Sequence, residues 1–151
     1  MAVRPVPEGY HTLTPYLIVS GAEAAIDFYK QAFGAQELFR FPFQGKIGHA
    51  ELQIGDSRFM LADEFPEMGA RAPGTIGGSP VGLCLYVENC DAVFEKAVAA
   101  GATVERPLKD QFYGDRSGTV RDPFGHQWTI STHVEDVPPE ELARRAAEME
   151  C

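Results

Sequence analysis

The 151-residue sequence has little cysteine, little basic charge and no long apolar run, and each shortage excludes a class of protein. The three cysteines are odd in number and lack CxxC spacing, so we expect neither a disulfide framework nor a cysteine metal site. No stretch approaches the roughly 18 apolar residues of a membrane span, and the first residues lack the apolar segment of a secretion signal. Lys and Arg number 13 against 22 Asp and Glu, a net charge of −9, which disfavours nucleic acid and anionic membrane as partners.

What is present is an ordinary globular composition, with 44% apolar and 23% charged residues. A chain of this length buries roughly two-thirds of its unfolded surface in one core without disulfides or metals. We therefore expect one folded domain over residues 1–151, located in the cytoplasm. Cys84 and Cys90 lie in or beside an apolar run and are expected to be buried, as reduced thiols.

The first half of the chain has the pattern of strand, helix and three strands. Apolar residues at helical spacing precede Gly34, a typical helix end, and glycine-containing turns separate short runs of β-forming residues. The pattern predicts strands at residues 12–19, 36–41, 46–54 and 58–62, with a helix at 22–33.

The second half repeats this order. Val19 and Gly34 are 15 positions apart, and their counterparts Val87 and Gly101 are 14 apart, which indicates an internal repeat of roughly 68 residues. The expected elements are strands at 81–87, 103–106, 119–121 and 127–132 and a helix at 91–100. The organisation is thus a first module at 9–62, a linker loop at 63–80, a second module at 81–134, and a C-terminal helix or tail at 135–151.

Alternation along the strand at 46–54 places His49, Glu51 and Gln53 on one face, opposite Ala50 and Leu52. The apolar face belongs under a helix. The polar face is expected either to line a concave site or to be an ordinary solvated sheet face.

The strings LIVSGAEAAIDFYKQAFGA and RDPFGHQWTIS resemble the glyoxalase/bleomycin-resistance/extradiol-dioxygenase superfamily, the vicinal oxygen chelate proteins. The resemblance covers about residues 9–134. HVEDV, DQFYGDRSG and GHAELQIGDSRFMLADE are most similar to the PhnB-type branch. The resemblance implies an α+β fold of two tandem βαβββ modules, whose curled, mostly antiparallel sheets form a cup, and a homodimer.

Catalytic members of that superfamily hold a divalent metal at positions that correspond here to Thr14, approximately Met60, Gly82 and Thr129. These four residues do not make a usable set of imidazole and carboxylate ligands. The departure favours a protein without a metal cofactor. The alternative is a relocated Zn, Ni or Mn site at His49 and Glu51, approached by His11 or His126, in a lyase or isomerase of the glyoxalase type.

Eight residues are expected to contact a small organic ligand, aromatic or cationic: Tyr16, His49, Glu51, Tyr86, Phe112, Tyr113, Asp115 and Arg116. Glu51 is the candidate base, with a pKa raised by an apolar cup. The loop at 111–116 equally suits a self-packed loop in which Asp115 pairs with Arg116 or Arg121. Trp128 is expected in the core and His126 in a turn.

Three functions therefore remain open. The first is a homodimer that sequesters a small molecule without metal, and the second is the metal-dependent lyase or isomerase. The third is an interaction module that docks a partner through the C-terminal helix and the loop at 63–80. Residues 135–151 carry 6 acidic and 2 basic residues, so nearly half of the net charge belongs to this tail and not to the modules.

Overall fold

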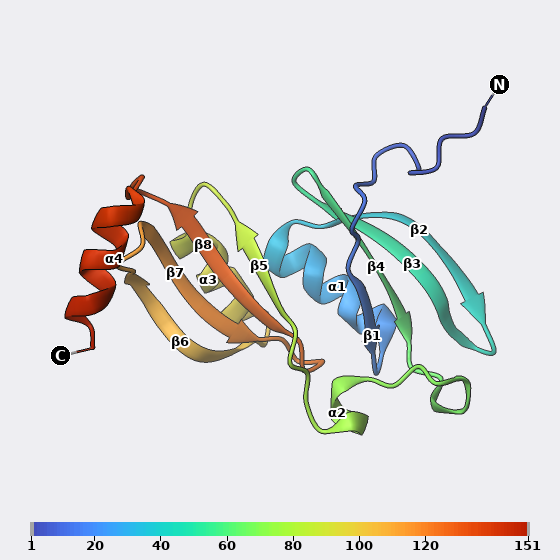
Figure 1. The fold of residues 1–151 in the computed structure, drawn as a ribbon. Helices are drawn as coiled ribbons and strands as arrows, with labels where there is room; N and C mark the ends of the chain where they lie inside the picture. The colour runs from blue at the N-terminus through green and yellow to red at the C-terminus, as the bar shows by residue number, and fades with distance from the viewer. Residues whose placement is uncertain (1, 151) are drawn as a thin grey trace. The chain divides into compact units, whose positions relative to one another are not determined.

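The computed structural model describes residues 2–150 and shows an α+β chain with two four-stranded sheets and a C-terminal helix (Figure 1). The chain forms two compact units. The first runs to Pro80 and includes Pro123–Gly125, and the second contains Val81–Asp122 and the chain from His126 onward. The predicted α+β class and the tandem βαβββ order are confirmed.

The first unit has one helix packed on a sheet of order β1-β4-β3-β2, with β1 parallel to β4 and the other neighbours antiparallel. Its elements are β1 (Tyr16–Val19), α1 (Ala22–Phe33), β2 (Gln36–Phe43), β3 (Lys46–Ile54) and β4 (Ser57–Asp63). The bounds of α1 and β3 agree with the sequence prediction. The first strand is shorter than predicted and begins after Pro15, which has no N–H to donate to a strand ladder.

The second unit repeats this topology in the order β5-β8-β7-β6. Its elements are β5 (Gly82–Tyr86), α3 (Cys90–Ala99), β6 (Thr103–Asp110), β7 (Asp115–Arg121), β8 (Gln127–His133) and the terminal α4 (Pro139–Glu148). Strands β6 and β7 are longer than predicted. Asp115 and Arg116 are therefore strand residues and not loop residues.

The segment predicted as a linker loop, 63–80, contains a 3₁₀ turn, η1 (Pro66–Met68), and the short helix α2 (Pro73–Ile76). The Glu64 carboxylate accepts hydrogen bonds from Ala72 N at 3.1 Å and from the Thr75 hydroxyl at 2.8 Å. These bonds join the start of the segment to α2, so the segment is an ordered connection.

Asp63, at the end of β4, stabilises the start of α1. Its carboxylate accepts hydrogen bonds from Gly21 N at 3.0 Å and Ala22 N at 2.8 Å, and from Ile47 N at 2.8 Å. Gly21 has no side chain that could cap the helix, so a carboxylate from a neighbouring strand satisfies these donors. Thr132 on β8 has the matching role in the second unit, since its hydroxyl accepts from Cys90 N at 2.9 Å.

The two cores lie between each helix and the apolar face of its own sheet. In the first unit, Tyr29 and Leu52 are fully buried, and Phe124 packs near Phe28, with ring centroids 6.2 Å apart. In the second unit, Trp128 is buried as predicted. Phe94 packs directly on Gly118, so that a Cβ added to Gly118 would lie 2.6 Å from the Phe94 ring. Burial contributes roughly 1.5–3 kcal/mol for each large apolar side chain.

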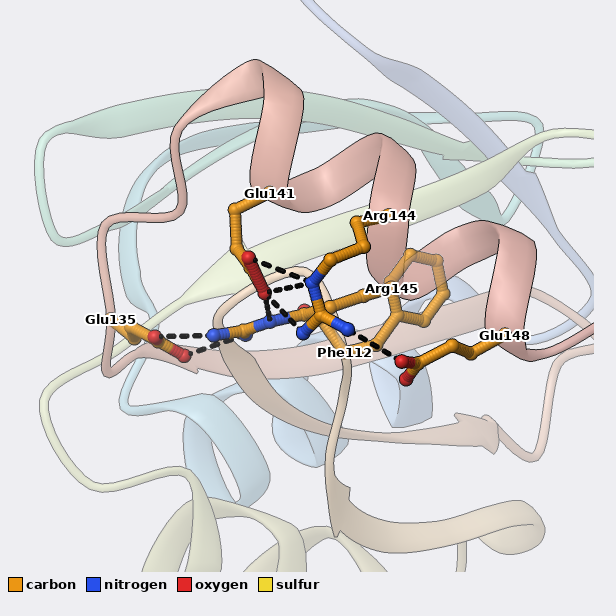
Figure 2. Close-up of polar contacts among 6 residues, drawn as sticks. All are labelled: Phe112, Glu135, Glu141, Arg144, Arg145 and Glu148. Atoms are coloured by element: carbon orange, nitrogen blue, oxygen red, sulfur yellow. Dashed lines mark hydrogen bonds and ion pairs between the residues drawn. The ribbon is translucent and has the colours of Figure 1, made fainter.

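Helix α4 carries no fully buried residue. Arg145 holds it to the preceding chain: Figure 2 shows its guanidinium directed at Glu135, with N–O distances of 2.9 and 2.8 Å, and at the carbonyl oxygen of Phe112, at 3.0 Å. The predicted terminal helix is confirmed over Pro139–Glu148.

Two further predictions concern cysteine and the membrane. Cys90 is buried as expected, but Cys84 is exposed, because it lies on the face of β5 that α3 does not cover. Both are free thiols, and Cys151 lies outside the described residues. Within residues 2–150, no helix is long and apolar enough to cross a membrane.

Candidate functional site

The face of the first sheet opposite α1 collects the sequence-predicted residues Tyr16, His49 and Glu51. Register partners on neighbouring strands point to the same side of a sheet. Tyr16 is in register with Met60, Met60 with Glu51, and Glu51 with Phe39. These four side chains, one from each strand, therefore lie on the same side of the sheet. His49 lies two residues from Glu51 and pairs with Phe41.

A chain of hydrogen bonds joins four of the side chains at this face. The Tyr10 hydroxyl donates to Glu51 Oε1. Glu51 Oε2 lies 2.9 Å from His49 Nε2, and His49 Nδ1 lies 2.8 Å from the Tyr16 hydroxyl. Both imidazole nitrogens therefore have partners inside the protein.

Arg58 holds Tyr10 in position. Its guanidinium lies 5.1 Å from the Tyr10 ring centroid, and it donates to Gln53 Oε1 at 2.9 Å and to the Glu8 carbonyl at 3.2 Å. Gly9 passes so close that an added Cβ would meet the guanidinium carbon at 2.3 Å. The contacts of Glu8 and Tyr10 with Arg58 thus hold the segment before β1 next to Glu51.

The expected raised pKa of Glu51 is wrong. Hydrogen bonds from Tyr10 and then from His49 lower the pKa of this carboxyl and outweigh its partial burial. The same network raises the pKa of Tyr10 to about 12, through burial and then through its bond to Glu51. Burial and the nearby Glu51 charge raise the pKa of Tyr16. Glu51 is therefore an ionised acceptor, and both phenols keep their protons at neutral pH.

Four rings lie next to one another across this face, and we call them the aromatic row: Phe39, Phe41, His49 and Tyr16. Successive ring centroids are 6.0, 5.8 and 5.5 Å apart, with Phe41 stacked on His49 at 29°. Tyr16, Phe39 and Phe41 are 47%, 51% and 43% exposed, although such rings are usually buried.

The second sheet carries its own hydrogen-bonded set, which contains the predicted residues Tyr86 and Asp115. The Tyr86 hydroxyl donates to Asp115 Oδ2 at 2.6 Å, and this bond, with burial, raises the pKa of Tyr86 to about 12. His133 lies 2.8 Å from Asp115 Oδ1 and 2.7 Å from Asp136 Oδ1. The predicted pairing of Asp115 with Arg116 or Arg121 is therefore wrong.

Those two arginines have other partners. Arg116 contacts Asp91 at 2.8 Å and Asp110 at 3.4 Å, and Arg121 contacts Glu105 at 2.8 Å. Side chains of neighbouring residues on a strand point to opposite faces, so Asp115 and Arg116 cannot share a side of β7.

Phe112 and Tyr113 form an edge-to-face pair with centroids 5.3 Å apart. Phe112 is half-buried, and its carbonyl oxygen accepts a hydrogen bond from Arg145 of α4, whereas Tyr113 is exposed. The prediction of Phe112 as a ligand contact stays open, and its loop contacts the C-terminal helix of the same chain through Arg145.

The four residues at the positions that the resemblance assigns to a metal, Thr14, Met60, Gly82 and Thr129, carry neither an imidazole nor a carboxylate. Met60 faces the same side as Tyr16, and Thr129 pairs with Cys84 and contacts the Thr119 hydroxyl at 3.1 Å. Thr14 lies before β1, and Gly82 has no side chain. Within residues 2–150, no three His, Cys, Asp or Glu side chains gather as a metal site, and this includes the surroundings of His49 and Glu51.

His126 is a turn residue, as predicted. Its backbone N–H donates to the buried Asp122 carboxylate at 2.9 Å, and the Trp128 indole donates to the other oxygen at 2.9 Å.

Sequence reasoning missed Tyr10, Phe39, Phe41, Arg58 and His133. Alternation of aromatic residues along 39–43 was a readable signal for the two phenylalanines. Tyr10 gave no such signal, because its partner Glu51 is 41 residues away along the chain, and the bond of His133 to Asp115 spans 18 residues.

The protein therefore has an α+β fold of two βαβββ units, each with a four-stranded sheet. The chain is a member of the Glyoxalase/Bleomycin resistance protein/Dioxygenase superfamily, whose family profile matches residues 10–130.

The chain is also similar to individual proteins. Uncharacterized protein Mb0911c of Mycobacterium bovis is 46% identical over 134 residues, which cover 86% of this chain and 88% of the relative. The crystal structure of TioX from Micromonospora sp. is 30% identical with a TM-score of 0.66, and the match covers 82% of this chain and 99% of TioX. A PhnB protein from Bacillus cereus shares the fold at 22% identity and a TM-score of 0.62, over 81% of this chain and 99% of its own.

Proposed function

We propose that this superfamily member binds a planar aromatic small molecule, uncharged or cationic, without a divalent metal and as a homodimer. The observation that carries the proposal is the aromatic row on the first sheet. Three exposed rings and one imidazole in succession offer stacking contacts that an isolated exposed phenylalanine does not.

The polar groups beside the aromatic row can orient a bound ligand. Glu51 is ionised and uses one lone pair on each oxygen for Tyr10 and His49, so it can accept a further hydrogen bond from a ligand cation. A few polar groups beside apolar surface are typical of sites for organic ligands. In the second unit, Tyr86 and Tyr113 remain proposed ligand contacts, since both are exposed.

The chemistry of the side chains supports binding without metal. Metal coordination at His49 requires a nitrogen lone pair, and coordination through Nε2 or Nδ1 would break the bond to Glu51 or to Tyr16. The dimer is proposed because members of the superfamily that the chain resembles are expected to dimerise.

Fluorescence titration with 9-aminoacridine, a planar aromatic cation, tests the binding site. We expect saturable binding that Phe41→Leu weakens about fivefold, because stacked aromatic pairs contribute about 1 kcal/mol. Glu51→Gln should weaken it further by removing the negative charge. Phe43→Leu is the matched control: Phe43 lies on the same strand, but its ring packs against Phe65 at 5.4 Å, outside the aromatic row.

Absence of saturable binding, or equal loss in Phe41→Leu and Phe43→Leu, overturns the binding site. Elemental analysis of protein purified without chelator tests the metal. Stoichiometric Zn, Ni or Mn that is lost in His49→Ala contradicts metal-free binding and favours the lyase or isomerase alternative. Light scattering that gives a monomer mass removes the homodimer from the proposal.

A further inference from the structure

Glu51 differs in its partners from two other glutamates of the sheets. Its side chain is 26% exposed, between those of Glu37 at 20% and Glu105 at 31%. Glu37 accepts a hydrogen bond from Arg40 at 3.0 Å, and Glu105 accepts one from Arg121 at 2.8 Å. Within residues 2–150, no lysine or arginine lies within ion-pair distance of Glu51. Carboxylates that are largely removed from water are normally paired with a cation, so Glu51 has negative charge available for a ligand.

The Glu51 carboxylate is held in place by one donor on each oxygen. The Tyr10 hydroxyl donates to Oε1, and His49 Nε2 donates to Oε2 at 2.9 Å, because an ionised carboxylate only accepts. Arg58 lies outside ion-pair distance and donates to other acceptors. A carboxylate oxygen can accept two hydrogen bonds, so each oxygen of Glu51 can accept one more. Glu51 is thus a fixed acceptor for two donors at once.

This acceptor lies beside the aromatic row. Phe39 is directly opposite Glu51 on strand β2, and the Cβ atoms of such cross-strand pairs are about 5 Å apart. Phe39 is half exposed, and the centroid of the Phe41 ring lies 6.0 Å from that of Phe39. A flat cation attached directly to an aromatic ring can therefore contact the carboxylate and these rings together.

We propose that the aromatic row binds aryl amidines, cations whose two N–H groups on one carbon both donate to Glu51. The inference deepens the proposed function and rests on it, because the aromatic row must hold the aryl group. The parallel N–H groups of an amidinium match the two oxygens of a carboxylate, as those of a guanidinium do, and such charge-assisted bonds are strong. A primary ammonium has the same charge without the planar pair of donors. An amide has the planar shape, but a carbonyl oxygen replaces one donor and the charge is lost.

Displacement of bound 9-aminoacridine by three naphthalene compounds tests the proposal. The compounds are naphthalene-2-carboxamidine, 2-(aminomethyl)naphthalene and naphthalene-2-carboxamide, which share the aryl group and differ in the atoms that meet Glu51. We expect the amidine to displace the dye at a concentration about tenfold lower than the amine does, and about 100-fold lower than the amide does.

Two matched variants assign this preference to one carboxylate. Glu51→Gln replaces an acceptor oxygen with a donor and removes the charge, so it should remove the preference for the amidine over the amide. Glu37→Gln is the control: Glu37 is in register with Leu52, on the side of the sheet opposite Glu51, and this variant should keep the parent preference. A preference that persists in Glu51→Gln, or that is lost equally in both variants, overturns the inference.

The parent protein alone also decides the matter, so the result does not depend on a variant that folds. Equal displacement by the amidine and the amine overturns the amidine class and leaves the proposed function standing. Saturable binding of 9-aminoacridine that none of the three compounds displaces has the same meaning. Absence of saturable 9-aminoacridine binding, in contrast, overturns the proposed function and the inference with it.

Discussion

The Nδ1 atom of His133 lies 2.8 Å from Oδ1 of Asp115, the residue directly opposite on strand β7. Its Nε2 atom lies 2.7 Å from Asp136 on the chain that leads to α4. Ionised carboxylates only accept, so both bonds require an imidazole protonated at both nitrogens. His133 therefore differs from His49, which has a carboxylate on one nitrogen and a hydroxyl on the other.

Stability should depend on pH through His133. Its bonds to Asp115 and then Asp136 raise its pKa in the folded state. A group whose pKa rises on folding contributes stability below its unfolded pKa, near 6.5, and loses that contribution as pH rises through the folded value. We expect the melting temperature to fall across this interval above pH 6.5, and less steeply in His133→Gln. Parallel curves for the two proteins would contradict this role.

Gly114→Ala should lower the free energy of unfolding more than Gly45→Ala does. Both glycines have positive φ, +99° and +77°, so both substitutions incur backbone strain of about 1 kcal/mol. Only at Gly114 does a Cβ also collide, 2.2 Å from the Glu135 carbonyl oxygen, whereas nothing lies within 4 Å at Gly45. Urea denaturation should give a free energy of unfolding lower by roughly 2–3 kcal/mol for Gly114→Ala and about 1 for Gly45→Ala. Equal losses would show that the close approach to Glu135 is unimportant.

Asp122→Ala should be among the more damaging single substitutions of a charged residue. The Asp122 carboxylate is buried and accepts from the His126 backbone and the Trp128 indole, so its removal leaves buried donors without that acceptor. We expect a loss of roughly 2–3 kcal/mol in urea denaturation. Asp110→Ala is the comparison, because Asp110 is exposed and its one ion pair within residues 2–150, with Arg116, is long at 3.4 Å. We expect this substitution to lower the free energy of unfolding by less than about 0.5 kcal/mol. Similar values for both would refute the structural role of Asp122.

Arg145→Ala should release α4 without unfolding the rest of the chain. Arg145 bonds to Glu135 and to the Phe112 carbonyl, whereas Arg144 bonds only to Glu141 and Glu148 of its own helix among the contacts in Figure 2. Limited proteolysis should cut near the start of α4 faster in Arg145→Ala than in Arg144→Ala. The melting temperatures should stay close, because exposed ion pairs contribute little. Equal cleavage rates would mean that other contacts hold the helix.

Local patterns in the sequence were enough to predict the order and type of the main helices and strands. Helical spacing of Ala25, Ile26, Tyr29 and Phe33 before Gly34 predicted α1 at its observed bounds, and alternation predicted which side of β3 is polar. These are local properties of the chain, set by the 3.6- and 2-residue periods.

The hydrogen-bonded and stacked pairs of side chains, in contrast, could be found only in the folded chain. The pKa of Glu51 depends on Tyr10, 41 residues away, and the partner of Asp115 is His133 on the neighbouring strand and not the adjacent Arg116. Strand register brings Phe41 beside His49, and it cannot be read from the pattern of either strand alone. Electrostatic and hydrogen-bond energies depend on distances of a few ångströms between residues far apart in sequence, so the site is a property of the folded chain.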